Sequence, residues 1–479
     1  MTRSLCSLLL ALFLGACASF SPDGGMAEVA QGVGREAGPG AGASVVKITS
    51  IEQAERAHQR AVALLAAGPI TADTAVEVAL LNNRDLQATY NDLGLSEAAY
   101  VQASLPPNPT ASLLRIGGTG VANFEFRLID DLLSLVTLKR RTDIAADRFA
   151  RARQQAVEAT LRVAADARRS FVRAVTAQQQ IALLDRSRAT VDSATRLYAK
   201  LAEAGGGDLL DETELAALYA ELSARLGQAR LTAHREREVL VRLMGLWGSD
   251  VSFSLPPELP SLPGEPDTLQ AVEVEAIKRR VDLAQARLEV SALAKSLALT
   301  NATRFVSMLQ LAGIVNNESA NPLTNTNTDI LRGGGQLDVS LPVFDTGEAR
   351  LRAAQETYMR ALNKLAAKAV NARSEARIAY ETYRGTYDIA RFWRDRIVPL
   401  RRTASREVEL RYNNGVLARE GLRVDLFRLL VDARIRISAE STAVDALRDF
   451  HLSVIDLETA LTIGGGGSAS GAADNGGIP

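Results

Sequence analysis

Leu81-Asn82-Asn83-Arg84-Asp85-Leu86 opens a helical stretch, and a related stretch, Lys278-Arg279-Arg280-Val281-Asp282-Leu283, opens a second one much later in the chain. After each come strand-like segments, a very long helical pattern, a turn and a helical return. A solenoid repeat has a period of about 20–50 residues, far shorter than this spacing. The sequence therefore indicates an internally duplicated molecule whose halves follow the order helix, strand, strand, long helix, helix.

The long helical pattern of the first half is free of Gly and Pro from 138 to 204. At a rise of 1.5 Å per residue such a helix extends for about 100 Å. Its alanines and alternating charges suit helices packed side by side, as in coiled coils. After Gly205-Gly206-Gly207 the chain returns along 209–244, which predicts a long helical hairpin.

The second half repeats this hairpin. Its outgoing helix is predicted over 348–411, with interruptions at Gly385 and Pro399. The chain then turns near Asn413-Asn414-Gly415 and returns to Leu461.

The helix that opens the first half is predicted from Thr71 to Leu105. Either Thr71 or Asp73 can cap its start. Three prolines between 106 and 109 end it, because proline cannot continue a helix.

Four short strands are predicted, at 110–116, 123–128, 305–315 and 336–343. The segment 316–335 between the last two is rich in Asn, Thr and Gly and is predicted to be a long exposed loop.

Hydrophobic alternation in the last strand places Leu337, Val339 and Leu341 on one side and Asp338 and Ser340 on the other. This pattern fits a membrane barrel wall, and it fits a small soluble sheet equally well. Four strands do not close a membrane barrel, so a spanning sheet requires several chains sharing one barrel.

The N-terminus has the pattern of a bacterial lipoprotein signal. Arg3 precedes an apolar run from Leu8 to Leu14, which is too short to span a bilayer. Leu14-Gly15-Ala16-Cys17 matches a lipobox, so cleavage before Cys17 and its acylation (palmitate among the chains) are expected. An ordinary secretory signal is the alternative. Ala18 stands where an Asp would favour inner-membrane retention, so delivery to the outer membrane is expected.

Composition argues against several classes of function, namely nucleic-acid binding, metal binding and catalysis. The net charge of −1, from 55 basic and 56 acidic residues, argues against nucleic acid as a partner. The two cysteines are Cys6 and Cys17, and the three histidines are far apart in sequence and fit no zinc spacing. With no catalytic motif and no cofactor loop, we expect a protein that is not an enzyme and holds no cofactor or metal.

These signals predict six segments. They are a signal peptide (1–16), a lipidated tether and wrap (17–70), a first repeat (71–250), a linker (251–266), a second repeat (267–463) and a disordered Gly-rich tail (464–479).

Several motifs together resemble the TolC-type outer-membrane efflux proteins, over about residues 70 to 463. Ala79–Leu86 resembles the family's opening, with Arg84 where a proline is usual, and Val101–Pro109 resembles its helix-to-strand exit. Arg279–Leu283 resembles the start of its second repeat. Leu341–Gly347 is similar to its strand-to-helix junction, with Pro342, Phe344, Asp345 and Gly347 at the matching positions.

The resemblance implies a mainly α fold with a small β part. Three chains would each give four strands to a 12-stranded outer-membrane β-barrel, and the long hairpins would form a periplasmic α-barrel. The homotrimer would be the exit duct of a tripartite efflux system, with a periplasmic adaptor and an inner-membrane transporter as partners. Outer-membrane lipid would surround the barrel.

The resemblance also places adaptor contacts or a gate at the periplasmic hairpin tips. In the first tip Gly205 and Asp211 match the family spacing, with Glu212 beside them. In the second tip Gly415 matches, but the segment with Arg419 and Glu420 departs from the common form. A plain solvated turn is the alternative for each position.

The substrate is the least determined part of this interpretation. Leu410–Gly415 and Ala446–Phe450 are similar to members associated with heavy-metal resistance, yet no Met, His or Cys cluster accompanies them. A duct for protein or polysaccharide secretion and a lipid-anchored coiled-coil scaffold remain as alternatives.

Overall fold

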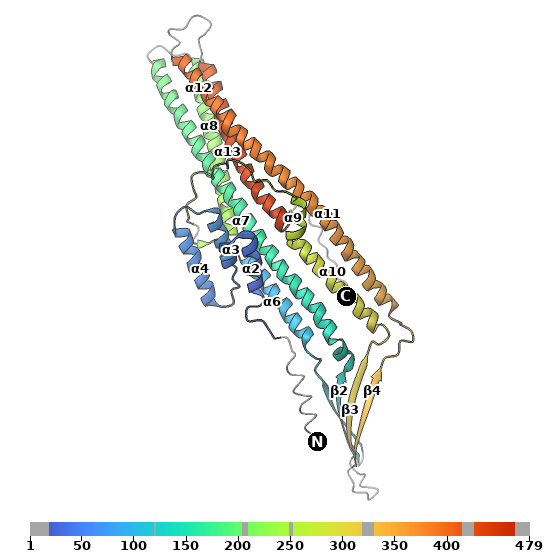
Figure 1. Cartoon of the computed structure of the whole chain (residues 1–479). Helices are drawn as coiled ribbons and strands as arrows, with labels where there is room; N and C mark the ends of the chain where they lie inside the picture. The colour runs from blue at the N-terminus through green and yellow to red at the C-terminus, as the bar shows by residue number, and fades with distance from the viewer. Residues whose placement is uncertain are drawn as a thin grey trace. The chain divides into compact units, whose positions relative to one another are not determined.

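The computed structural model describes residues 19–118, 121–203, 209–248, 252–318, 330–413 and 426–464 (Figure 1). Contacts divide the chain into two compact units. Unit 1 is formed by residues 1–27, 90–156 and 282–369, and unit 2 by residues 28–89, 157–281 and 370–479. Each unit therefore draws on both halves of the sequence.

The elements of the two halves follow the same order, which confirms the duplication. The first half contains α5 (Ala72–Asn82), α6 (Arg84–Ser104), β1 (Thr110–Gly118), β2 (Val121–Asp131), α7 (Leu132–Glu203) and α8 (Leu209–Leu243). The second half contains α9 (Val272–Arg279), α10 (Val281–Thr303), β3 (Leu309–Glu318), β4 (Ile330–Val339), α11 (Glu348–Phe392), η3 (Trp393–Ile397), α12 (Val398–Asn413) and α13 (Leu426–Thr462). Among the described residues, no helix is both long enough and apolar enough to cross a membrane.

The opening helix of each half is broken at the repeated motif. Thr71 is the cap of α5, and its hydroxyl accepts a hydrogen bond from the Thr74 amide at 3.1 Å. Asn83 has extended backbone angles, and its side-chain oxygen accepts from the Leu86 amide at 3.0 Å, so it ends α5 and caps α6. Arg280 has the same extended conformation between α9 and α10. The sequence predicted one continuous helix here, because neither break contains Pro or Gly.

The four predicted strands are present and form one antiparallel sheet in the order β1-β2-β3-β4. Their bounds differ from the prediction in the second half. The strand expected at 305–315 begins at Leu309, and the one expected at 336–343 ends at Val339. The expected loop 316–335 is shorter, because Arg332-Gly333-Gly334-Gly335 pairs with β3 despite its glycines.

The helix α7 has 72 residues, which confirms the long Gly- and Pro-free pattern. In the second half Gly385 does not interrupt α11, since an isolated glycine costs only about 1 kcal/mol in a helix. The interruption is the π-helical segment η3, just before Pro399. Proline has no amide hydrogen, so a change in hydrogen-bonding pattern at this point is the expected response.

In the tether and wrap before Thr71 the sequence predicts one helix, near 51–66. The structure has this helix as α4 (Ile51–Ala66), and the described residues also form α2 (Met26–Ala37) and α3 (Pro39–Ala43). The helices α2 and α3 approach closely where Gly42 meets Gly34, and a side chain on Gly42 would lie 2.8 Å from the Gly34 Cα.

The first half closes at a second tight contact. Gly245 has φ +64, and a Cβ atom there would lie 2.6 Å from the Asn82 carbonyl oxygen. The Asn83 side-chain amide donates to the Leu243 carbonyl at 3.3 Å. The end of α8 is therefore fixed against the end of α5.

We expect Gly245→Ala to lower the free energy of unfolding by about 2–4 kcal/mol, since it combines a left-handed backbone with a backbone clash. Gly227→Ala is the matched control, because Gly227 lies in α8 with open space around its missing Cβ. It should be neutral or stabilising by up to about 1 kcal/mol. Denaturant unfolding of both variants measures the difference, and equal effects would contradict the contact.

Candidate functional site

The sheet has one apolar face, and its register shows which residues form it. Phe126 pairs with Leu113 on β1 and with Val315 on β3, and directly paired side chains lie on the same face. Leu311 pairs with Leu337 on the same side. The large side chains of this face are exposed in the single chain; they are Leu113, Phe124, Phe126, Leu128, Leu311, Val315, Leu331, Leu337 and Val339.

The opposite face of the sheet carries polar side chains of β2 and β4, together with the exposed apolar residues Leu114, Ile116 and Ile330. Glu125 and Arg127 form an ion pair along β2, and the Gln336 amide donates to the Asp338 carboxylate at 2.7 Å along β4. This alternation agrees with the sequence-based expectation that Leu337 and Val339 face away from Asp338. One surface of the sheet is therefore predominantly apolar, whereas the other combines charged, polar and apolar side chains.

The sheet is open at both edges. In the order β1-β2-β3-β4, β1 pairs only with β2 and β4 only with β3 within the described residues. Each edge strand therefore presents backbone amide and carbonyl groups that need partners.

The predicted junction residues lie together after β4. Gly347 is buried with φ +73, and a Cβ atom there would lie 2.7 Å from the Arg304 carbonyl oxygen. Its amide donates to Asp345 at 2.8 Å, and the Asp345 carboxylate lies 3.5 Å from Arg350. Pro342 is half-buried, whereas Phe344 is 100% exposed. Gly347 is thus required by the turn, and Phe344 is not packed against any described part of the chain.

At the first hairpin tip, the structure places Asp211 and Glu212 in the first turn of α8. The Tyr198 hydroxyl on α7 donates to the Asp211 carboxylate at 2.8 Å, which links the two arms of the hairpin. The other candidates, Cys17, Gly205, Gly415, Arg419 and Glu420, lie outside the described residues.

The two hairpins share one apolar core near these tips. It is formed by buried residues of α7, α8 and α13: Leu184, Val191, Leu215, Leu218, Leu222, Leu226, Leu426, Leu430 and Ile437. Tyr198, Tyr219 and Tyr412 pack against it. The Arg434 guanidinium on α13 donates to Glu221 on α8 at 3.2 Å. The described ends of α7, α8 and α13 are therefore packed on one core that both repeats share.

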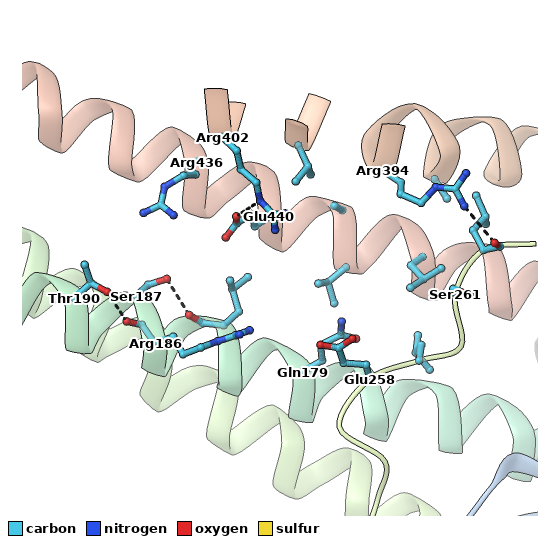
Figure 2. A pocket seen from close by; sticks show the side chains of 18 residues that line it. Gln179, Arg186, Ser187, Thr190, Glu258, Ser261, Arg394, Arg402, Arg436 and Glu440 are labelled. Carbon is cyan, nitrogen blue, oxygen red and sulfur yellow. Dashed lines mark hydrogen bonds and ion pairs between the residues drawn. The ribbon is translucent and has the colours of Figure 1, made fainter. Parts of the chain in front are cut away.

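Farther along the same unit a cavity of about 750 Å³ lies where α7, the linker after α8 and α11 to α13 meet (Figure 2). Four arginines line it, and two are neutralised by protein groups. Arg402 donates to Glu440 at 3.1 Å, and Arg394 donates to Asp395 at 2.6 Å and to the Leu262 carbonyl at 3.2 Å. Arg186 and Arg436 add further positive charge on the α7 and α13 sides (Figure 2).

Sequence reasoning missed how the linker is held. The Tyr387 hydroxyl donates to the Gly264 carbonyl at 2.5 Å, and the Tyr383 hydroxyl accepts from the Asp267 amide at 2.8 Å. His451 Nε2 donates to the Pro260 carbonyl at 2.9 Å. Burial lowers the pKa of His451 and raises the pKa of Tyr383. The only available signal was the spacing of Tyr383 and Tyr387, which lie on one helix face.

Within the described ranges, no group of three or more His, Cys, Asp or Glu side chains is arranged to hold a metal ion. The described residues instead offer a two-faced sheet, a closely packed turn at Gly347, and acidic side chains at the start of α8.

No protein-family model matches this sequence, and no curated protein matches it in a sequence search. Solved structures do match the fold. The Campylobacter jejuni CmeC outer-membrane channel has a TM-score of 0.68 at 16% identity, covering 81% of this chain and 85% of that one. The open state of the Neisseria gonorrhoeae MtrE outer-membrane channel has a TM-score of 0.67 at 18% identity, covering 81% and 88%.

A third match is CusC, whose structures describe folding and transmembrane channel formation. It has a TM-score of 0.66 at 16% identity and covers 82% of this chain and 92% of that one. The chain has the fold of outer-membrane channels of the TolC type. The resemblance inferred from the sequence motifs is thereby confirmed at the level of the fold.

The contact between Tyr198 and Asp211 leads to a prediction about the tip. Tyr198→Phe removes one hydrogen bond to a carboxylate, so opening of the first turns of α8 should become easier by about 1–2 kcal/mol. Hydrogen exchange of the amides from 209 to 215 measures this. Tyr219→Phe is the control, because Tyr219 packs on the same apolar core. The same acceleration in both variants would contradict a specific role for the Tyr198 hydroxyl.

Proposed function

We propose that this chain is the outer-membrane channel component of a tripartite efflux system. Three copies form a passive exit duct for small molecules or metal ions. An inner-membrane pump drives export, and a periplasmic adaptor connects it to the tips of the helical hairpins. The observation that carries the proposal is the open four-stranded sheet with one predominantly apolar face and one face that carries ion-paired and hydrogen-bonded polar side chains.

The first argument for a trimer concerns the backbone hydrogen bonds of the sheet. A sheet in the hydrocarbon region of a bilayer must pair all its backbone groups, so its edges must meet other strands. Four strands enclose no lumen, whereas three copies supply twelve. With β4 of one copy beside β1 of the next, the apolar residues would face lipid and the polar residues would face a water-filled lumen.

The second step concerns the helices. The hairpins of unit 2 present charged side chains around a shared apolar core, and α7 alone would extend for about 100 Å at the standard helical rise. Such a length serves to bridge a compartment better than to build a globular core. The names of the solved structures with this fold support the proposal, because CmeC and MtrE are outer-membrane channels.

The third step concerns membrane delivery. Cleavage before Cys17 and its acylation would tether each copy in the outer membrane, since each buried CH₂ contributes about 0.8 kcal/mol. In this proposal the acyl chains on Cys17 attach each copy to the outer membrane independently of the sheet. The segment after Cys17, through α2 to α4, belongs partly to unit 2.

The two faces of the sheet can be tested with neighbouring residues. Leu128→Arg puts a charge on the apolar face, which costs about 2–4 kcal/mol at a bilayer midplane. We expect the amount of trimer in outer membranes to fall by at least about tenfold. Ile129→Arg places the same charge on the polar face and should leave the trimer intact. Quantified membrane fractions of both variants measure this, and equal loss would reject the assignment of faces.

The duct itself is tested by single-channel conductance in a planar bilayer, with the oligomeric mass measured in the same detergent. We expect a trimer that conducts weakly, and severalfold more strongly after Asp211→Asn or Arg419→Gln, because both remove charges that the sequence resemblance assigns to the tips. Glu236→Gln, which removes a charge from the same helix as Asp211 but far from the tip, is the control. A monomer without conductance would instead favour a lipid-anchored scaffold.

A further inference from the structure

The cavity between α7, the linker and the helices α11 to α13 lies within one compact unit of the chain (Figure 2). Every residue that lines it belongs to unit 2. Its volume of about 750 Å³ falls in the range of pockets that hold small organic molecules. The proposed duct does not require such a cavity, so its lining can be considered separately.

One end of the cavity is basic. Arg186 on α7, Arg402 on α12 and Arg436 on α13 line this end, and Figure 2 shows Arg186 across the cavity from the other two. Two hydrogen bonds of 2.9 Å join Gln180 on α7 to Ser441 on α13. Because these helices run in opposite directions (Figure 1), Arg186 and Arg436 lie on the same side of that contact. Positive charge therefore faces this end from three helices.

The positive charge is only partly neutralised by the protein. Arg402 donates to Glu440 at 3.1 Å, whereas Arg186 and Arg436 form no ion pair with any described residue. Arg186 uses its Nε to donate to the Ala182 carbonyl at 3.1 Å. Three guanidinium groups face the Glu440 carboxylate alone among the residues lining this end, which leaves an excess of two positive charges.

Arg436 has the clearest unfilled hydrogen-bonding group. Its Nε is buried and has no hydrogen-bond partner among the described residues. Asp432 lies one turn earlier on α13, and its Oδ2 is likewise without a partner there. A buried N–H without an acceptor costs free energy, so such groups are normally satisfied by protein, water or a ligand. An anionic oxygen in the cavity would satisfy the Arg436 Nε with a charge-assisted hydrogen bond, which is stronger than a neutral one.

The other end of the cavity is apolar. Beyond Ser441, α13 continues away from the basic end, and the linker packs there. The apolar lining is formed by Leu259, Leu262, Ala390, Val444 and Leu447. Arg394 also lies at this end, but it donates to Asp395 and to the Leu262 carbonyl. A second charge on a ligand would lie against apolar side chains here, which is unfavourable.

We propose that this cavity binds an anionic amphiphile, a molecule with one carboxylate or sulfonate head and an apolar body. The head accepts hydrogen bonds from Arg436 and pairs with Arg186, since guanidinium groups match the geometry of such heads. The body is buried against the linker and α13, where it leaves water. An inorganic anion would leave the apolar end unused, and a cation would meet the excess of positive charge. The inference goes beyond the proposed duct and does not rest on it.

Binding can be measured by energy transfer from Trp393. This residue packs against a core that includes Leu262 and Ala390, both of which line the cavity. The other tryptophan, Trp247, is 80% exposed, so W247F leaves Trp393 as the donor without removing a packed side chain. The full, lipidated chain is placed in phosphatidylcholine nanodiscs and titrated with dansyl-labelled undecanoic acid. We expect saturable transfer to the dansyl group that is absent in W247F/W393F.

Substitutions of arginine test the basic end. R436Q removes the guanidinium with the buried Nε and should raise the Kd of the probe by about tenfold. R186Q should raise the Kd by about threefold, and it decides the test if R436Q does not assemble, because Arg186 is exposed. R401Q is the matched control, since Arg401 is exposed on the same helix as Arg402 but does not line the cavity. It should leave the Kd unchanged.

Competition tests the apolar end. Decanoate should displace the probe at a concentration at least about a hundredfold lower than sulfate, because each buried methylene group adds to the affinity. Decanedioate should compete far more weakly than decanoate, because its second carboxylate would lie at the apolar end.

The outcomes separate the parts of the proposal. Transfer that does not saturate, or a Kd in R436Q and R186Q equal to that in R401Q, would overturn the anion site. Displacement by sulfate as effective as that by decanoate would overturn the amphiphile and indicate a simple anion site. The proposed duct is tested by trimer formation and conductance, which none of these measurements uses, so failure of one proposal is distinguishable from failure of the other.

Discussion

The unpaired edges of the four-stranded sheet are the constraint on which the proposed assembly depends. Every strand edge exposes amide and carbonyl groups at regular intervals, and in an apolar medium these groups have no partner except another strand. Within the sheet neighbouring strands are paired throughout, from Thr110 with Ile129 to Leu309 with Val339. The backbone groups without a partner strand are therefore those on the outer edges of β1 and β4. A copy of the same chain supplies the complementary edge, which makes symmetry the simplest solution.

The long helices were predictable from the sequence because helix propensity and capping depend on residues close together in the chain. The absence of Gly and Pro from 138 to 204 predicted α7, and the cap at Thr71 predicted the start of α5. The strand bounds failed where tertiary pairing overrides propensity: Gly333 to Gly335 enter β4 because β3 offers partners along their whole length. The helices α2 and α3 were missed because the segment that forms them is rich in glycine, although Met26, Val29 and Val33 form a short buried stripe on α2.

The candidate site residues divide in the same way. Asp345 and Gly347 could be found from a motif, because a turn imposes its residues. The pairing of Tyr198 with Asp211 joins two helices across a turn, and the fixing of the linker by Tyr383, Tyr387 and His451 joins segments far apart in the chain. No spacing rule encodes such contacts. Residue-by-residue resemblance predicted the location of the first tip but not the partner of its carboxylate.

The π-helical segment Trp393–Ile397 has a consequence for the symmetry between the repeats. A π-turn contains one residue more than an α-turn, so every side chain after it is rotated by about 100° relative to an uninterrupted helix. The faces that α11 and α12 present are therefore out of phase, although the chain axis continues. The counterpart α7 has no such offset. The outgoing helices of the two repeats thus no longer present equivalent surfaces beyond Ile397. A partner that binds one of these helices would not bind the other with the same set of contacts.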